Sequence, residues 1–159
     1  MDEIRTTLDD FDLLLTGAAS QDLRAALHQQ IRAFNDSRSE PHRSARQAGA
    51  SQLDIYIYDA ERRLRGGLVA STYWDWLEID DLWLDEALRG RGYGRQLMRM
   101  AEAEARVRGC RRAWVRTFRF QAPGFYERLG YRVVGVLEDY PPGNALYWMR
   151  KDFVGEEAG

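Results

Sequence analysis

The chain has 159 residues, which suffices for one domain with a hydrophobic core and is short for two. Hydrophobic residues make up 45% and charged residues 30% of the sequence, which excludes a disordered or a membrane-embedded composition. The formal net charge of −2 predicts no general attraction to nucleic acid or lipid, and the single cysteine, Cys110, excludes an internal disulfide and a cysteine-based zinc site.

The first third of the chain predicts one helix. Residues 20–35 place apolar side chains at helical spacing, with Ser20 or Asp22 as the N-cap. Residues 36–51 are polar and mixed, which predicts a loop or a second helix.

Strand patterns follow, interrupted by one long and one short helix. The strands are expected over 53–58, 64–74, 77–84, 111–118, 131–139 and 145–153. The long helix runs from about 92 to 108, and Gly109 ends it in a left-handed conformation. The short helix, over 122–130, begins near Pro123. This order predicts an α+β, or mixed α/β, domain around one sheet.

Residues 88–98 read LRGRGYGRQLM and place three glycines and three arginines where the long helix begins. The stretch lacks the lysine and hydroxyl of a Walker loop, and Arg95 stands where a dinucleotide-binding fingerprint needs its third glycine. The first turn of a helix offers unpaired N–H groups and partial positive charge, so a ligand that carries a pyrophosphate fits here. A tight structural turn with solvated arginines is the alternative.

Two motifs resemble those of a known family. Arg89-x-x-Gly92-x-Gly94, between a strand and a helix, resembles the cofactor motif of the GNAT superfamily of acyl-CoA-dependent N-acyltransferases. FQAPGFYERLGYRVVG, residues 120–135, is similar to the C-terminal motif of that superfamily. The resemblance implies a central, mostly antiparallel sheet of six to seven strands with a splayed parallel pair, flanked by about four helices. It further implies that residues 1–159 form a single domain.

The resemblance implies acetyl-CoA as the cosubstrate, bound where the two parallel strands splay apart. Its pyrophosphate would contact the backbone of the glycine loop, which comprises Arg89, Gly90, Arg91, Gly92, Tyr93, Gly94 and Arg95. Its pantetheine arm would pair with the main chain of the preceding strand at Leu82, Trp83 and Leu84. Arg119 stands where the family often has an asparagine that touches the cofactor, which puts that contact in doubt.

Three residues are candidates for the chemistry. Tyr126 matches the general-acid tyrosine of the family, with simple packing as the alternative. Glu78 stands eleven residues before Arg89, the spacing at which histone-acetylating relatives carry their general base. By the two-residue period Asp80 shares the side of Glu78, whereas Asp81 is expected to point the other way. A solvated or substrate-binding acidic rim is the alternative, and many relatives that act on small molecules use water chains instead.

We therefore expect an N-acetyltransferase that moves an acetyl group from acetyl-CoA to a primary amine of a small molecule, by direct attack in a ternary complex. The alternatives are acetylation of a protein or peptide amine, and a non-catalytic acyl-CoA-binding module. Trp74, Trp76 and Trp83 either line an amine pocket or pack as cross-strand pairs.

The remaining expectations concern partners and location. Glu102 and Glu104 alternate with the arginines of the long helix, so we expect no nucleic-acid partner. We also expect no metal. No membrane partner is expected either, because no apolar stretch is long enough to span a bilayer. The N-terminus lacks the pattern of a secretory signal, which predicts a cytoplasmic location. Dimers are frequent in the family, so a homodimer is a further expectation.

Overall fold

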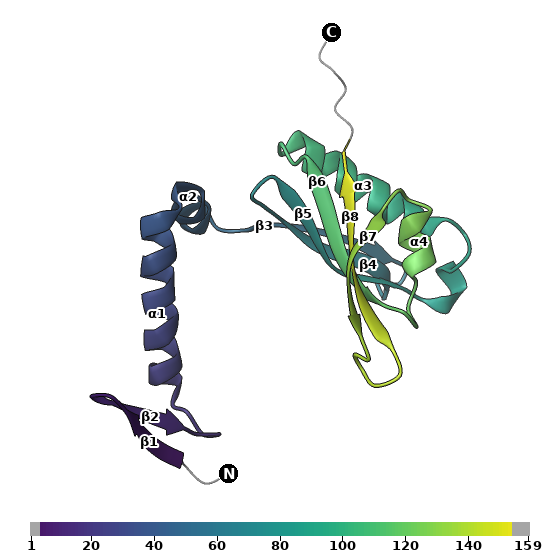
Figure 1. Ribbon diagram of the computed structural model, residues 1–159. Coiled ribbons are helices and arrows are strands. Elements are labelled where there is room, and N and C mark those ends of the chain that lie inside the picture. Colours follow the sequence, from purple (N-terminus) through teal and green to yellow (C-terminus); the bar gives the residue numbers. More distant parts are fainter. Residues whose placement is uncertain (1–3, 154–159) are drawn as a thin grey trace. The chain divides into compact units, whose positions relative to one another are not determined.

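The computed structural model describes residues 4–153, and the chain falls into two compact units that divide near residue 47. The N-terminal unit contains a hairpin of β1 (Ile4–Leu8) and β2 (Phe11–Leu15), followed by α1 (Gln21–Arg38) and α2 (Glu40–Ala48) (Figure 1). That residues 1–159 act as a single domain stays a prediction.

The N-terminal unit confirms one predicted helix and adds a hairpin. The helix expected over 20–35 is α1, and Ser20 is its N-cap, because its hydroxyl accepts a hydrogen bond of 3.2 Å from the Leu23 amide. Residues 36–51 contain a second helix, α2, so the helical alternative was correct. The β1–β2 hairpin was not predicted.

The C-terminal unit is built on a mixed sheet whose described strands number six, in the order β3-β4-β5-β6-β8-β7. Every neighbouring pair is antiparallel except β5 and β6. The strands are β3 (Ser51–Tyr58), β4 (Leu64–Tyr73), β5 (Trp76–Leu84), β6 (Arg112–Phe118), β7 (Arg132–Glu138) and β8 (Ala145–Asp152). The helices are the 3₁₀ turn η1 (Glu86–Leu88), α3 (Tyr93–Val107) and α4 (Pro123–Glu127). The expected mixed α+β fold with one parallel pair is confirmed.

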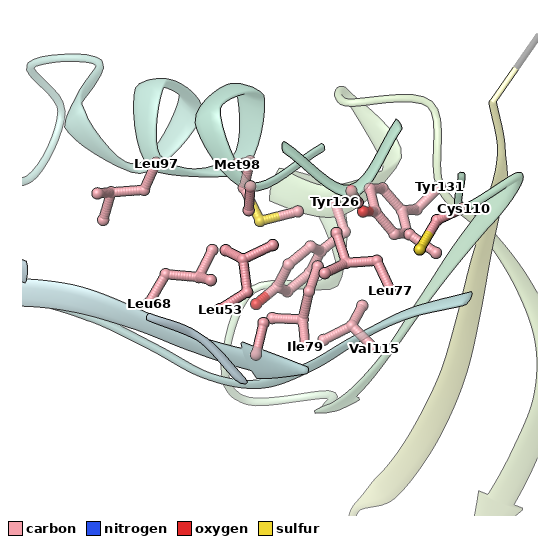
Figure 2. Packing of buried hydrophobic residues seen from close by; sticks show 14 of the residues in the cluster. Leu53, Leu68, Leu77, Ile79, Leu97, Met98, Cys110, Val115, Tyr126 and Tyr131 are labelled. Atoms are coloured by element: carbon pink, nitrogen blue, oxygen red, sulfur yellow. The ribbon is translucent and has the colours of Figure 1, made fainter. Parts of the chain in front are cut away.

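The core of this unit lies between α3 and the sheet, where α3 packs across β3, β4 and β5 (Figure 1). Figure 2 shows the packing, in which Met98 of α3 lies over side chains of the central strands. The largest fully buried side chains are Leu68, Leu77, Met98, Met149 and Val115. Burial of each such side chain contributes roughly 1.5–3 kcal/mol, which fixes α3 against the strands that carry the site.

One carboxylate is buried in this layer and is fully paired. Glu102 of α3 accepts hydrogen bonds from the Lys151 ammonium at 2.6 Å and from the Tyr131 hydroxyl at 3.2 Å, and Arg106 lies 3.8 Å away. Since a buried carboxylate needs such partners, this cluster ties α3 to β8 and to the segment after α4.

The parallel ladder between β5 and β6 is short. It pairs Trp76–Ile79 with Arg112–Val115 and stops there, although both strands continue. At this point β5 has a bulge at Asp80, because Ala70 of β4 pairs with Ile79 and the preceding residue, Val69, pairs with Asp81. The two strands therefore separate beyond Ile79, which is the predicted splay.

Two findings concern the chain as described. No helix within residues 4–153 is long and apolar enough to cross a bilayer. The same residues contain no group of three or more His, Cys, Asp or Glu side chains placed to hold a metal ion.

Candidate active site

A cavity of about 720 Å³ opens where β5 and β6 separate, between the end of β5, the start of α3, and α4. Its volume is that of a typical ligand site. The predicted site residues in its wall are Asp80, Leu82, Leu84, Arg89, Gly90, Gly92, Tyr93, Gly94, Arg95 and Tyr126. Trp83 and Arg91 are not in the wall: Trp83 is half exposed, and the Arg91 guanidinium donates to the Ala87 carbonyl at 3.2 Å.

The glycine loop presents bare backbone amides at this cavity. Gly90 and Gly92 have φ angles of +69° and +87°, a conformation that glycine adopts without strain. Gly92 is the N-cap of α3, and no side chain caps the helix there. Among the described residues, the amides of Gly90, Arg91 and Gly92 meet no hydrogen-bond acceptor. These amides and the first turn of α3 form a cluster of donors suited to a phosphate group.

Gly94 brings the helix close to α4. A Cβ built on Gly94 would lie 3.2 Å from Cζ and 3.3 Å from Cε2 of Phe125, so any other residue here requires the Phe125 ring to shift. The close approach places Tyr126, the next residue of α4, near the start of α3.

Arginines add positive charge around the cavity. Arg89 Nε donates to the Leu84 carbonyl at 3.0 Å, which ties the loop to the end of β5. Arg95 lines the cavity, and so do Arg116 of β6 and Arg128 at the end of α4. Sequence reasoning missed Arg116 and Arg128, because neither lies in the glycine motif; the position of Arg128 two residues after Tyr126 was the available signal.

Tyr126 is buried beneath the cavity with its hydroxyl unpaired. Its ring packs edge-on against Phe125 at 5.1 Å and Tyr131 at 5.9 Å between centroids. Within the described chain its hydroxyl has no hydrogen-bond partner. Burial, with a smaller contribution from the nearby Asp81 carboxylate, raises the pKa of Tyr126 to about 12. The phenol is therefore neutral at physiological pH and is free to donate a hydrogen bond into the cavity.

The three carboxylates of β5 do not share one cavity. Asp80 and Asp81 both line the cofactor-sized cavity and Glu78 does not, so the expectation that Asp80 shares the side of Glu78 while Asp81 lies opposite was wrong for Asp80. The bulge at Asp80 is the reason, because it breaks the two-residue alternation between Ile79 and Asp81. Glu78 instead lines a second hollow. Burial, and then the charge of Asp80, raise the pKa of the Glu78 carboxyl, while Arg116 acts in the opposite direction.

Arg119 does not reach the cavity. Its Nε donates to the Tyr147 hydroxyl at 3.0 Å and a terminal nitrogen pairs with Glu138 at 2.9 Å. Gln121 lines the cavity instead, and its side-chain carbonyl accepts a hydrogen bond from the Phe118 amide at 2.9 Å, which orders the turn after β6.

The second hollow, of about 460 Å³, lies on the face of the sheet turned away from α3. Its strand residues Trp76, Glu78 and Trp114 alternate with core residues such as Leu77 and Val115, which places them on the opposite face. We call it the aromatic hollow and define it by Tyr73, Trp74, Trp76, Glu78, Trp114, Val134, Trp148, Met149 and Arg150. Of the tryptophans singled out in the sequence, Trp74 and Trp76 thus face a common hollow, and Trp83 does not.

Comparison with known proteins gives a consistent result. Residues 21–131 match the model of the acetyltransferase (GNAT) family. Blasticidin-S acetyltransferase of Streptomyces morookaense is 42% identical over 130 residues, which cover 77% of this chain and 96% of that protein.

Solved structures share the fold. An acetyltransferase from Bacillus cereus superposes with a TM-score of 0.76 at 30% identity, covering 87% of this chain and 97% of that one. A streptothricin acetyltransferase candidate from Bacillus anthracis, solved in complex with acetyl coenzyme A, superposes with a TM-score of 0.57 at 19% identity, covering 65% and 63%.

Proposed function

This chain belongs to the acetyltransferase (GNAT) family, and from that membership we propose that it moves the acetyl group of acetyl-CoA to a primary amine of a small molecule. An acetyl-transferring activity follows from the family itself. One observation carries the finer proposal: the unpaired amides from Gly90 to Gly92 open on the same cavity as Tyr126.

The cavity suits a long ligand with a diphosphate near one end. The loop amides and Arg95 would hold the diphosphate by charge-assisted hydrogen bonds. Beyond Ile79 the edge of β5 that faced β6 has no described partner strand, so its main chain can pair with the amide groups of a pantetheine arm. The complex of the Bacillus anthracis protein with acetyl coenzyme A supports this choice of cosubstrate.

Glu78 has the properties of a general base. The amine must lose a proton: an alkyl amine has a pKa near ~10 and is mostly charged at neutral pH, and even a neutral amine gives up one N–H proton when the amide bond forms. The Glu78 carboxylate has no hydrogen-bond or ion-pair partner within residues 4–153, and its pKa is raised by burial and by Asp80. A carboxylate of this kind accepts a proton more readily than an exposed one, directly or through water. Asp80, which lines the cofactor-sized cavity and whose charge acts on Glu78, is the second candidate.

Tyr126 would assist departure of the sulfur. Acetyl-CoA supplies the thioester carbonyl that the amine attacks and the sulfur that leaves as its bond to the acetyl carbon breaks. A thiol has a pKa near ~8.5, below the value of about 12 for Tyr126, so complete proton transfer to the thiolate is uphill. Tyr126 would therefore donate a hydrogen bond to the sulfur as negative charge develops there.

Direct transfer is favoured over a covalent enzyme intermediate. Cys110, the only cysteine, is buried in the hydrophobic core and lies in the wall of neither hollow. The amine and the thioester would then react in one ternary complex. A small-molecule acceptor is supported by the name of the Streptomyces relative, which acts on blasticidin-S.

Two measurements test this function. Calorimetry should show acetyl-CoA binding about 100-fold more tightly than acetyl-pantetheine, which lacks the diphosphate, because several charge-assisted hydrogen bonds are lost. Equal affinities would contradict the role of the loop. A thiol-release assay over a panel of small amines and peptides should then find turnover with small amines. Binding without thiol release over the whole panel would instead indicate a non-catalytic acyl-CoA-binding module.

A further inference from the structure

The aromatic hollow has no part in the cofactor site, and its composition is specific enough to suggest a ligand. We propose that it binds the acceptor and that the acceptor carries its amino group on a flat conjugated ring. This inference rests on the proposed function, because it names the class of amine that would be acetylated.

The hollow collects large rings that the C-terminal unit leaves partly uncovered. Trp76, Trp114 and Trp148 come from three different strands and all remain partly exposed, and Trp74 is 46% exposed. Rings of this size gathered around one concave surface typically mark a binding site rather than a core. A ring with two flat faces is the ligand that such walls contact most extensively.

The backbone is distorted at two points around the hollow. Trp74 and Asp75 join β4 to β5 with φ angles of +49° and +60°, although a bulky residue avoids this left-handed region. On β7 a bulge leaves Val134 without a pairing partner, since Val133 pairs with Met149 and Gly135 with Trp148. Val134 contributes to the hollow as a result. Strain and bulges of this kind recur at functional sites.

The position of the hollow matches that of an acceptor. Glu78 pairs in register with Trp114, one step before the last pair of the parallel ladder. A ligand on Trp114 with its amino group at Glu78 therefore lies beside the point where β5 and β6 stop pairing, and the cofactor-sized cavity opens at the same point. Its amino N–H could donate directly to the unpaired Glu78 carboxylate.

The charges around the hollow favour a ring over a free-standing cation. Three guanidinium groups already lie over its tryptophans: Arg112 and Arg150 over Trp76 at 5.4 and 5.2 Å, and Arg116 over Trp114 at 5.8 Å. Two of these guanidinium groups, Arg112 and Arg150, pair with Asp152, and together the three already occupy tryptophan faces on which a cation would lie, whereas a neutral conjugated ring stacks on tryptophan and on guanidinium alike. Within the described residues no cation lies over Trp148, which leaves that ring available.

Three small probes test the inference by calorimetry on the full chain, with and without coenzyme A. Cytosine and uracil are flat rings of the same size that differ in an amino group against a carbonyl, and cyclohexylamine is a saturated amine. Cytosine should bind about tenfold more tightly than uracil, because the uracil carbonyl faces the Glu78 carboxylate without a donor. Cyclohexylamine should bind more weakly than either ring. Equal binding of cytosine and cyclohexylamine, or no binding of either pyrimidine, would overturn the inference.

Substitutions in the aromatic hollow test whether the pyrimidines bind there. Trp148→Leu should weaken both pyrimidines about fivefold or more through lost stacking, and Trp114→Leu should do the same. Glu78→Gln should reduce the preference for cytosine over uracil, because an amide can donate as well as accept. The matched control is Tyr58→Leu, which removes an exposed strand tyrosine that holds Arg62 at 5.1 Å outside both cavities. An equal loss in the control would refute the assignment.

The two proposals fail separately. Acetylation of alkyl amines without pyrimidine binding would overturn this inference and leave the proposed function intact. Pyrimidine binding in the hollow without acetyl transfer to any amine would overturn the function and leave the aromatic site standing.

Discussion

Two neighbouring tyrosines allow the chemistry to be separated from the packing. Tyr126 and Tyr131 lie 5.9 Å apart between ring centroids, and both are largely buried, so replacing either by phenylalanine removes one hydroxyl from a similar environment. Their hydroxyls differ in their partners. That of Tyr126 has none within residues 4–153, whereas that of Tyr131 donates to Glu102 at 3.2 Å.

The difference sets the expected magnitudes. Tyr126→Phe should change the free energy of unfolding by less than about 0.5 kcal/mol, because no hydrogen bond is lost, and should lower kcat about 100-fold or more. Tyr131→Phe should cost about 2 kcal/mol of stability, the usual value for a buried hydrogen bond to a charged group. Its kcat per folded molecule should stay within about twofold of the parent.

Urea unfolding and a thiol-release assay on both variants measure these effects. The pKa of Tyr126, about 12, adds a condition on pH: the phenol keeps its proton through the physiological range, so its ionisation causes no loss of activity below about pH 11. A Tyr126→Phe enzyme with full kcat would refute the assigned role. A loss of kcat in both variants alike would show that ring packing, and not the hydroxyl, supports turnover.

Three further predictions concern the glycine loop, the base and the buried carboxylate. At opposite ends of α3, Gly92→Ala and Gly109→Ala force alanine into nearly the same left-handed conformation, with φ angles of +87° and +85°. Thermal unfolding should therefore show similar stability losses of about 1 kcal/mol in the two variants. Calorimetry should show weakened acetyl-CoA binding only in Gly92→Ala. A general base must be deprotonated to act, and burial and Asp80 raise the pKa of Glu78. As the pH falls, kcat/KM should therefore decline with an apparent pKa above the ordinary value of a glutamic acid, and Glu78→Gln should abolish this decline. An unchanged pH profile in the variant would assign the role of base to another group. Glu102→Gln should lower the free energy of unfolding in urea by about 3 kcal/mol, because it leaves Lys151 without its buried partner. The control Glu104→Gln, which changes an exposed carboxylate, should lower it far less. Equal losses would mean that the Glu102 cluster adds nothing to stability.

Local patterns account for what the sequence predicted well. The helix over 92–108, the glycine loop and the six strands of the C-terminal unit all rest on periodicity or on turn residues within a short window. The left-handed conformation predicted at Gly109 is confirmed (φ +85°) and belongs to the same class, because positive φ is a property of a single residue.

The features that were missed depend on neighbours or on irregular backbone. That Asp80 lines a cavity with Asp81 and not with Glu78 could not be predicted, because a bulge at Asp80 leaves no mark on the sequence pattern of the strand. The aromatic hollow needs Trp148 of β8 beside Trp114 of β6, and this order of strands is set by non-local pairing. The β1–β2 hairpin has a turn at Asp9 and Asp10 without the glycine that usually identifies such a turn.

The early end of the parallel ladder opens the cofactor-sized cavity between β5 and β6, and the aromatic hollow lies on the face of the sheet turned away from α3. If the cofactor and the acceptor occupy these two hollows as proposed, neither substrate has to leave before the other arrives. Double-reciprocal plots of initial rates should therefore give intersecting lines without a compulsory order of substrate addition, and each product should leave from the side on which its substrate bound.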